Sequence, residues 1–366
     1  MVSVRGMREG PVTDALTRDR AFVTGGEGFI GSTLVAALLA RGLRVTIFDD
    51  LSATDGHRSA ALGETEAVAE ATTDPHPRLR FVRGDVRDLA ALEAAMAGHG
   101  LVAHLAAHTD IALGRTDPWR DFQVNVVGTW NVLEAMRRLD VGRLMFASSG
   151  TVYGYPASVP TAESYGPLLP ESPYAAAKLA GESLIAGSAA LHGWRALAFR
   201  LGNTVGEHSD HGLVHDLVVK LLRDPGCLEL LGDGRQAKPY VAVDDVVTAM
   251  LLAESVAPAA TLTVLNVGTS GTLTVARVAE LVIDALGLDD TAVERVYLDG
   301  AARGGGGWPG DTPLVDLDTA ALRALGWAPR YSAEEAIRRA AIGTRDRLLR
   351  CGLPLLTTAE RRARSA

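Results

Sequence analysis

The chain has 366 residues, of which 47% are hydrophobic and 22% charged, and its net charge is −8. This length predicts one large domain or two unequal ones, and the composition is that of a folded globular protein. The negative charge argues against a nucleic-acid partner, since nucleic-acid binders neutralise phosphates with clustered Lys and Arg. No apolar run approaches the ~20 residues that cross a bilayer, so we expect no membrane partner.

Cysteine and histidine spacing gives no support to a metal site. Cys227 and Cys351 have neither the spacing of metal ligands nor that of a disulfide framework, so we expect a cytoplasmic protein. His208, His211 and His215 are suggestively spaced, but the glutamate of a zinc protease motif is missing. A polar or substrate-facing loop is the better interpretation of these histidines.

From residue 20 onward, segments rich in β-branched residues alternate with longer amphipathic segments. We expect strands at 21–25, 44–50, 79–85, 101–107, 142–149 and 194–201. We expect helices between them, notably over 29–42, 122–139 and from Tyr174 onward. This alternation predicts an α/β fold with a Rossmann-like, doubly wound parallel sheet and right-handed crossovers.

The turn TGGEGFIG (24–31) follows the first strand directly and opens a helix. Its glycines allow a pyrophosphate to approach the backbone, where the amides of a helix N-terminus meet the negative charge. The second strand ends in Asp49 and Asp50, and an acid there can accept both ribose hydroxyls of NAD while repelling the 2′-phosphate of NADP. The pattern predicts NAD as the cofactor, with Asp49 as the ribose partner and Asp50 able to share the task. An ordinary glycine turn followed by capping acids is the alternative.

The sequence pattern changes after Leu201: the expected loops lengthen, and Gly and Pro cluster at 232–239 and 303–313. We expect a smaller α/β substrate-binding lobe over the carboxyl ends of the strands, where doubly wound folds bind ligands. The predicted division is a flexible tail over 1–19, an NAD-binding domain over 20–201 with a return segment near 240–268, a substrate lobe over 202–239 and 269–350, and a C-terminal tail over 351–366.

The TGxxGxxG spacing, with the YxxxK of Tyr174 and Lys178 some 150 residues later, resembles the extended short-chain dehydrogenase/reductase family. Over roughly residues 20–330 the chain is most similar to the nucleotide-sugar epimerases and dehydratases of that family, in particular the UDP-glucose 4-epimerases. Further matches are GDVRD (84–88), HLAA (104–107) and NVVGT (125–129). The cofactor contacts that this resemblance implies are Gly25, Gly28, Phe29, Ile30, Gly31, Asp49, Asp50, Asp85, Val86, Leu105, Ala106, Ala107, Asn125, Tyr174 and Lys178.

The same resemblance implies catalysis by Ser149, Tyr174 and Lys178, with Ser149 in the strand end SSGTVYG (148–154). The spacing of four places Tyr174 and Lys178 on one helix face, one turn apart. Free tyrosine titrates near pH ~10 and is a poor base at neutral pH, but a nearby ammonium and a positively charged nicotinamide would each lower its pKa. Ser149 would relay the proton of the sugar hydroxyl. An ordinary surface pair on an alanine-rich helix is the alternative.

Two residues after Ser149 favour one reaction within the family. The family's dehydratases carry Thr-Asp-Glu ahead of Val-Tyr-Gly, because eliminating water requires an acid and a base. Gly150 and Thr151 stand at the two acidic positions here. The resemblance therefore favours a nucleotide-sugar 4-epimerase, which oxidises C4 transiently and returns the hydride to the opposite face. The alternatives are a dehydratase or decarboxylase of the same family, or a non-catalytic NAD-binding protein.

The nucleotide-sugar side of the site departs from the family's pattern. The substrate contacts that the resemblance implies are Ser149, Thr151, Asn203, Lys238 and Asp311. Lys238 stands where the family has an arginine on the pyrophosphate, and it keeps the charge without the planar fork. Trp308 replaces the arginine of an RPGD motif, so we expect an unusual nucleotide sugar or weaker binding.

Two further expectations come from the resemblance alone. It implies a homodimer through the helices that begin near Phe122 and Tyr174. It also implies that the LGWAP segment (325–329) is a structural anchor.

Overall fold

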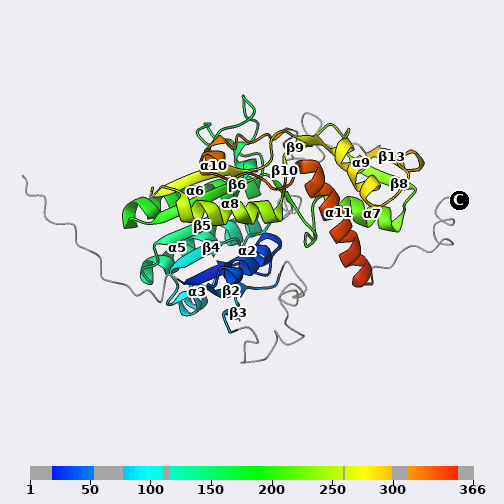
Figure 1. Ribbon diagram of the computed structural model, residues 1–366. Helices are drawn as coiled ribbons and strands as arrows, with labels where there is room; N and C mark the ends of the chain where they lie inside the picture. The colour runs from blue at the N-terminus through cyan, green and yellow to red at the C-terminus, as the bar shows by residue number, and fades with distance from the viewer. Residues whose placement is uncertain are drawn as a thin grey trace, which may run out of the picture.

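The larger part of the molecule is built on one parallel sheet of seven strands (Figure 1). The computed structural model describes residues 19–52, 77–109, 116–258, 260–298, 312 and 314–352. The strands of the sheet are β1 (Arg20–Thr24), β2 (Arg44–Asp49), β3 (Leu79–Arg83), β4 (Leu101–His104), β5 (Arg143–Ser149), β6 (Arg195–Leu201) and β11 (Leu262–Val267). Their order is β11-β6-β5-β4-β1-β2-β3, and every neighbouring pair is parallel. This confirms the predicted α/β fold with a Rossmann-like, doubly wound parallel sheet, whose strand order reverses between β1 and β4.

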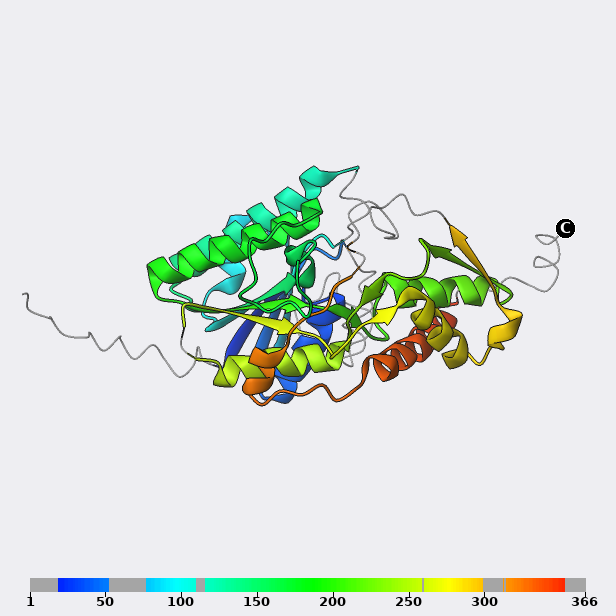
Figure 2. The ribbon, with the colours of Figure 1, turned by 90° about the horizontal axis from the view of Figure 1, so that it is seen from above.

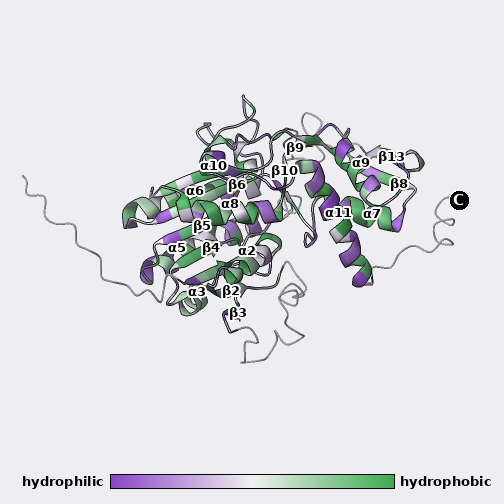
Figure 3. Cartoon of the chain, viewed as in Figure 1, coloured by the Kyte–Doolittle hydropathy of each residue, from purple (hydrophilic) through white to green (hydrophobic). Residues whose placement is uncertain are grey.

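Helices cover both faces of this sheet, as the view from above shows (Figure 2). One face packs against α2 (Phe29–Ala40), α8 (Val243–Val256) and α10 (Ala320–Ala324). The other packs against α3 (Leu89–Met96), α5 (Gly128–Arg138) and α6 (Pro173–His192). Strands buried on both faces are hydrophobic along nearly their whole length, which is why they are green in Figure 3.

A second, smaller group of elements has a hydrophobic core of its own. Its helices are α7 (Leu213–Arg223), α9 (Val275–Ala285) and α11 (Ala333–Arg350). Its strands are β7 (Asn203–Val205), β8 (Cys227–Leu231), β9 (Ala237–Lys238), β10 (Tyr240–Ala242), β12 (Leu273–Thr274) and β13 (Glu294–Leu298), and a 3-10 turn, η5, spans Asp290–Ala292. These strands pair two by two, β7 with β10, β8 with β13 and β9 with β12. The domain limits drawn from the sequence stay a prediction.

The segment 122–139 is helical as predicted, but it is not a single α-helix. A short helix, α4 (Pro118–Asp121), leads into a π-helix, η3 (Phe122–Val127), and only then does α5 begin. At the junction, a Cβ on Gly128 would lie 2.6 Å from Val86 Cγ2, so the first turn of α5 approaches the loop after β3 closely. Single π turns of this kind are frequent at functional sites.

The segment before α11 is anchored to the large sheet's helices. Trp327 is buried and donates its ring N–H to the Asp245 carbonyl oxygen at 3.2 Å. The Asp245 carboxylate accepts backbone bonds from Arg330 and Tyr331 at 2.8 and 3.1 Å. Both parts of the molecule are therefore tied together at the start of α8. Among the described residues, no helix has both the length and the apolar character needed to cross a bilayer.

Candidate active site

The turn between β1 and α2 can exist only with glycine at its key positions. Gly25 has φ +69°, and a Cβ there would lie 2.5 Å from the Ala106 backbone nitrogen. A Cβ on Gly31 would lie 1.9 Å from the Gly25 carbonyl oxygen. Gly28 precedes α2 with no side-chain cap from the described residues, so the first amides of the helix are available to an anion, beside Phe29 and Ile30. This geometry fits a dinucleotide pyrophosphate.

The two acids at the end of β2 have different hydrogen-bond partners. Asp49 is 9% exposed, and its carboxylate accepts the Glu27 N–H at 3.0 Å and the Leu51 N–H at 2.9 Å. Leu51 has φ 63°, an uncommon value for this residue, and this turn brings its N–H to Asp49. Asp50 accepts instead from the Ser52 N–H. Asp49, not Asp50, is therefore the acid that lies against the glycine turn.

The other predicted cofactor residues follow the carboxyl ends of neighbouring parallel strands. Asp85 follows β3, where a hydrogen bond from Arg87 lowers the pKa of its carboxyl group. Val86 is buried. Leu105, Ala106 and Ala107 follow β4, and Leu105 N donates to Thr24 O at 3.1 Å. Because parallel strands end at one edge of the sheet, these residues share the edge with the glycine turn.

Asn125 lies within the π-helix η3, and it is 3% exposed. Its side-chain oxygen accepts the His108 N–H at 2.8 Å, and its amide group donates to His108 O at 2.9 Å. Asn125 therefore fixes the backbone that continues from the HLAA strand end.

The predicted catalytic residues meet where the start of α6 crosses the end of β5. Lys178 is 3% exposed, and its Nζ donates to Ala147 O at 2.8 Å. The same Nζ lies 5.9 Å from the centroid of the Tyr174 ring. The half-buried Tyr174 hydrogen-bonds with Ser149, whose Oγ is also 2.8 Å from Thr151 Oγ1. The structure therefore brings together Ser149, Thr151, Tyr174 and Lys178.

The protein alone shifts the phenol pKa in the direction opposite to that predicted. Burial raises the pKa of Tyr174 to about 12; the Ser149 hydrogen bond opposes this rise and the negative charge of Asp121 adds to it. Burial also lowers the pKa of Lys178 to about 8, so its positive charge is itself costly in this place. The predicted lowering by lysine is wrong for the protein alone, since Lys178 does not contribute to the pKa of Tyr174 there.

Sequence reasoning missed an ion pair beside these residues. Asp121 is 1% exposed, and its Oδ1 lies 2.8 Å from His108 Nδ1. Its Oδ2 has no hydrogen-bond partner among the described residues. The only signal in the sequence is the i,i+4 spacing of Asp121 and Asn125, which a helix places on one face.

A buried histidine links the glycine turn to α5. His104 Nδ1 lies 2.7 Å from Thr24 Oγ1, and its Nε2 lies 3.0 Å from Thr129 Oγ1. Burial, together with the nearby charge of Lys178, lowers the pKa of His104 to about 3. His104 is therefore a neutral structural link.

Of the residues predicted to hold the substrate, Ser149 and Thr151 lie at the end of β5 and in the turn after it, whereas Asn203 and Lys238 lie in the smaller group of elements. Asn203 is exposed on β7, and its backbone N–H donates to Pro239 O at 3.0 Å, which brings it next to Lys238 on β9. Lys238 Nζ is bonded to Thr312 O. Asp311 and Trp308 lie outside the described residues.

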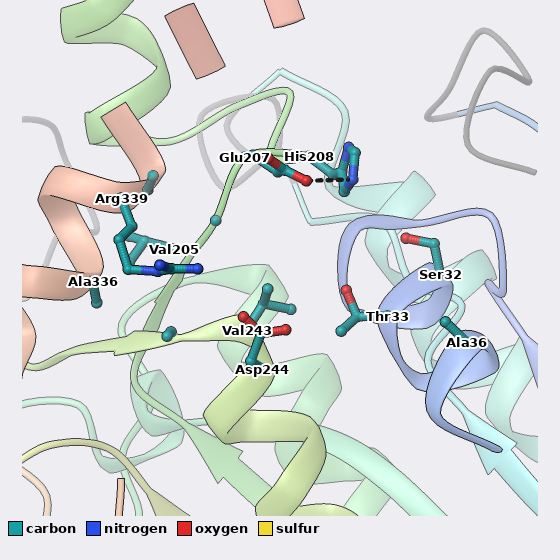
Figure 4. A pocket seen from close by; sticks show the side chains of 13 residues that line it. Ser32, Thr33, Ala36, Val205, Glu207, His208, Val243, Asp244, Ala336 and Arg339 are labelled. Atoms are coloured by element: carbon teal, nitrogen blue, oxygen red, sulfur yellow. Dashed lines mark ion pairs between the residues drawn. The ribbon is translucent and has the colours of Figure 1, made fainter. Parts of the chain in front are cut away.

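None of the predicted site residues lines the cavity of about 330 Å³ that Figure 4 shows. It is bounded by α2, by the start of α8, by α11 and by the loop after β7. Glu207 and His208 form an ion pair of 3.1 Å in that loop. His211 and His215 likewise turn to the acids beside them, Asp210 and Asp216. The described residues hold no group of three or more His, Cys, Asp or Glu that could bind a metal ion.

Comparison with known proteins identifies the family. Residues 21–268 match the NAD dependent epimerase/dehydratase family, and the chain therefore belongs to it. A putative UDP-glucose 4-epimerase of Methanocaldococcus jannaschii is 30% identical over 323 residues, which cover 87% of this chain and 95% of the relative. A UDP-glucose 4-epimerase of Thermus thermophilus, solved in complex with NAD, is 32% identical with a TM-score of 0.76 and covers 89% of this chain and 99% of its own.

Dehydratases of the same family are also similar. A dTDP-glucose 4,6-dehydratase of Streptomyces venezuelae, solved with NAD, is 29% identical with a TM-score of 0.77, over 90% of this chain and 98% of its own. The relatives and structural neighbours thus include both reaction types, with UDP-glucose 4-epimerases prominent among them.

The position of Asp49 predicts which acid sets cofactor preference. We expect Asp49→Asn to weaken NAD binding about 10- to 100-fold, because a charged acceptor for hydroxyl groups is worth ~1.5–3 kcal/mol. It should also narrow the preference for NAD over NADP. Asp50→Asn is the matched control, and we expect less than about threefold change. Titration of both nucleotides measures this, and a larger loss in Asp50→Asn than in Asp49→Asn would reverse the assignment.

Proposed function

We propose that the protein is an NAD-dependent nucleotide-sugar 4-epimerase. The observation that carries this proposal is the meeting of Tyr174, Ser149 and Lys178 at the same sheet edge as the glycine turn. Relatives named UDP-glucose 4-epimerases cover most of this chain, which supports a substrate of that class.

In this proposal NAD is held by the glycine turn, Asp49 and Lys178, and it supplies a site that accepts a hydride and returns it. Tyr174 takes the proton from the sugar C4 hydroxyl. Ser149, bonded to Tyr174, orients that hydroxyl between the two oxygens. Positioned proton transfer of this kind is typically worth about 10²–10⁴-fold in rate.

The phenol needs positive charge from outside the chain in order to act as this base. With a pKa raised to about 12, Tyr174 is protonated at neutral pH. An oxidised nicotinamide carries a positive charge, and an opposite charge within ~4–6 Å favours the ionised form. Tyr174 would therefore be available as a base when the bound nicotinamide is oxidised.

Epimerisation is favoured over elimination of water by the residues after Ser149. Gly150 and Thr151 belong to a 3-10 turn, η4 (Gly150–Tyr153). Thr151 Oγ1 is engaged with Ser149, and a Cβ on Gly150 would lie 3.2 Å from Leu201 O. Neither position offers a carboxyl group, whereas oxidation and reduction at C4 require none.

The substrate proposal includes three residues beyond the catalytic group. Asn203, Lys238 and Asp311 are proposed to hold the nucleotide sugar's phosphates and sugar. Support for the first two comes from the hydrogen bond between the Asn203 backbone and Pro239, the residue that follows Lys238. A lysine holds phosphate as a point charge, without the bidentate geometry of arginine.

The assembly that we propose is a homodimer through α5 and α6, which lie side by side (Figure 2). Trp119, Phe122 and Trp130 are 61%, 45% and 50% exposed, and the first two rings stack at 5.2 Å. Leu191 on α6 is 78% exposed. Large exposed apolar side chains on neighbouring elements are a feature of interaction surfaces.

We also propose a cytoplasmic location. Cys227 and Cys351 are both free thiols, as a reducing compartment would keep them.

The function predicts a specific effect at Tyr174. We expect Tyr174→Phe to lower kcat by about 10³-fold or more, because Phe cannot accept a proton, while bound NAD and folding persist. Interconversion of UDP-glucose and UDP-galactose, then of other nucleotide sugars, is followed by NMR of the products. Tyr297→Phe, at an exposed site on β13, serves as the control. Substantial turnover by Tyr174→Phe, or water loss from the sugar in the wild type, would refute the proposal.

The dimer predicts a change of mass at one position. We expect the wild-type protein to sediment as a dimer and Trp130→Glu to sediment as a monomer, because a charge would be buried in the apolar contact. Tyr297→Glu places the same charge on another exposed aromatic residue and should leave the dimer intact. A monomeric wild type, or a dimeric Trp130→Glu, would rule out this interface.

A further inference from the structure

Three side chains of α6 are directed at three consecutive residues of β5. Tyr174, Lys178 and Glu182 are spaced by four and therefore lie along one stripe of the helix. Tyr174 hydrogen-bonds with Ser149, and Lys178 donates to Ala147 O at 2.8 Å. Between these contacts, Ser148 Oγ donates to Glu182 Oε1 at 2.5 Å. Each of the last three residues of the strand is thus held by the helix.

Glu182 is itself held by the neighbouring strand. Arg200 on β6 donates to both carboxylate oxygens, from Nε at 3.0 Å and from Nη2 at 2.7 Å. Arg200 and Glu182 are 4% and 5% exposed, and Arg200 is the register partner of Ser148. The ion pair is therefore a buried, bidentate bridge from α6 to β6, beside the register partner of Arg200 in β5.

Stability alone is a poor reason for this pair. Removing two charges from water costs several kcal/mol, and well-packed apolar residues of similar volume are often as stabilising or more so. A buried, hydrogen-bonded ion pair does impose a fixed geometry, because the guanidinium and the carboxylate must align to form two parallel hydrogen bonds. Glu182 lies one turn beyond Lys178 on α6, and its partner Ser148 immediately precedes Ser149. This location suggests that the fixed geometry serves the predicted catalytic residues.

Arg200 also secures the turn that follows Ser149. Its guanidinium lies 4.8 Å from the centroid of the Tyr153 ring in η4. Tyr153 in turn donates its hydroxyl to Asn266 Oδ1 at 2.7 Å. The same arginine therefore restrains the strand before Ser149 and the turn after it.

We propose that Glu182, clamped by Arg200, is a positioning residue for the reaction: by holding Ser148 it fixes Ser149 against Tyr174 and Lys178. This inference rests on the proposed function. Glu182 does not contact the reacting atoms. Its action passes through Ser148, whose hydroxyl donates to Glu182 Oε1 from the strand that carries Ser149.

If Glu182 positions Ser149, loosening the end of β5 should change the pKa of Tyr174. A purely structural role of Glu182 would leave that pKa unchanged. The Ser149 hydrogen bond is the contact that lowers the pKa of Tyr174, against burial and against Asp121, which is paired with His108. Without it the pKa rises, and the limb of the kcat–pH profile that reports phenol ionisation moves to higher pH. The titratable groups near Tyr174, namely Lys178, Asp121 and His108, are unchanged by a Ser148 substitution.

The decisive variant is Ser148→Ala, which removes the link and alters no charge. With UDP-galactose as the probe, we expect kcat to fall about 10-fold, KM to change less than about twofold, and bound NAD to stay at the wild-type level. The rising limb of kcat should shift to higher pH. Glu182→Gln should show the same pattern with a fall of about 100-fold, since it also leaves Arg200 unpaired.

A matched control lies at the other end of the same strand. Arg143 begins β5 and pairs with Glu254, so Glu254→Gln disturbs an ion pair of β5 far from Ser149. We expect it to lower thermal stability with wild-type kcat and pH profile. Wild-type kcat and profile in Ser148→Ala would overturn the inference, even where Glu182→Gln fails to fold. The proposed function would survive that result, since it falls only if Tyr174→Phe remains active.

Discussion

The site depends on one contact surface, where a stripe of α6 meets the last residues of β5. A buried ammonium, Lys178, donates to Ala147 O, and the Tyr174 phenol reaches Ser149 one turn earlier. Both helix and strand belong to the rigid centre of a sheet covered on two faces, so neither can adjust independently. Catalytic geometry is usually lost through displacements of about 1 Å, and this surface is built to resist them.

The electrostatics of this surface disfavour the Tyr174 phenolate in the absence of a positively charged cofactor. Burial raises the pKa of Tyr174 to about 12 and lowers that of Lys178 to about 8, so the site disfavours charge on both groups. Asp121 opposes the phenolate as well. A positively charged ligand at the sheet edge would lower the pKa of Tyr174. The phenol would then ionise only when the cofactor is bound.

Much of the fold and of the candidate site could be predicted from the sequence, because short local patterns indicate them. The glycine turn, Asp49 and the Tyr174–Lys178 spacing each belong to a few consecutive residues. The π-helix before α5 could not be predicted, because a helical sequence pattern does not by itself distinguish π turns from α turns. The Glu182–Arg200 and His108–Asp121 pairs join residues 18 and 13 positions apart on different segments, and the tertiary fold brings them together. The direction of the Tyr174 pKa likewise depends on burial, which spacing does not show.

The most direct test of the account is the ionisation of Tyr174 itself. NMR of isotope-labelled tyrosine, with the Tyr174 signal assigned by its loss in Tyr174→Phe, can follow that group through a pH titration of the NAD-loaded protein. We expect the phenol of the loaded protein to titrate well below about 12, the value that burial imposes on the chain alone. A Tyr174 signal that still titrates near that value in a fully active, NAD-loaded protein would contradict the central claim that it is the base.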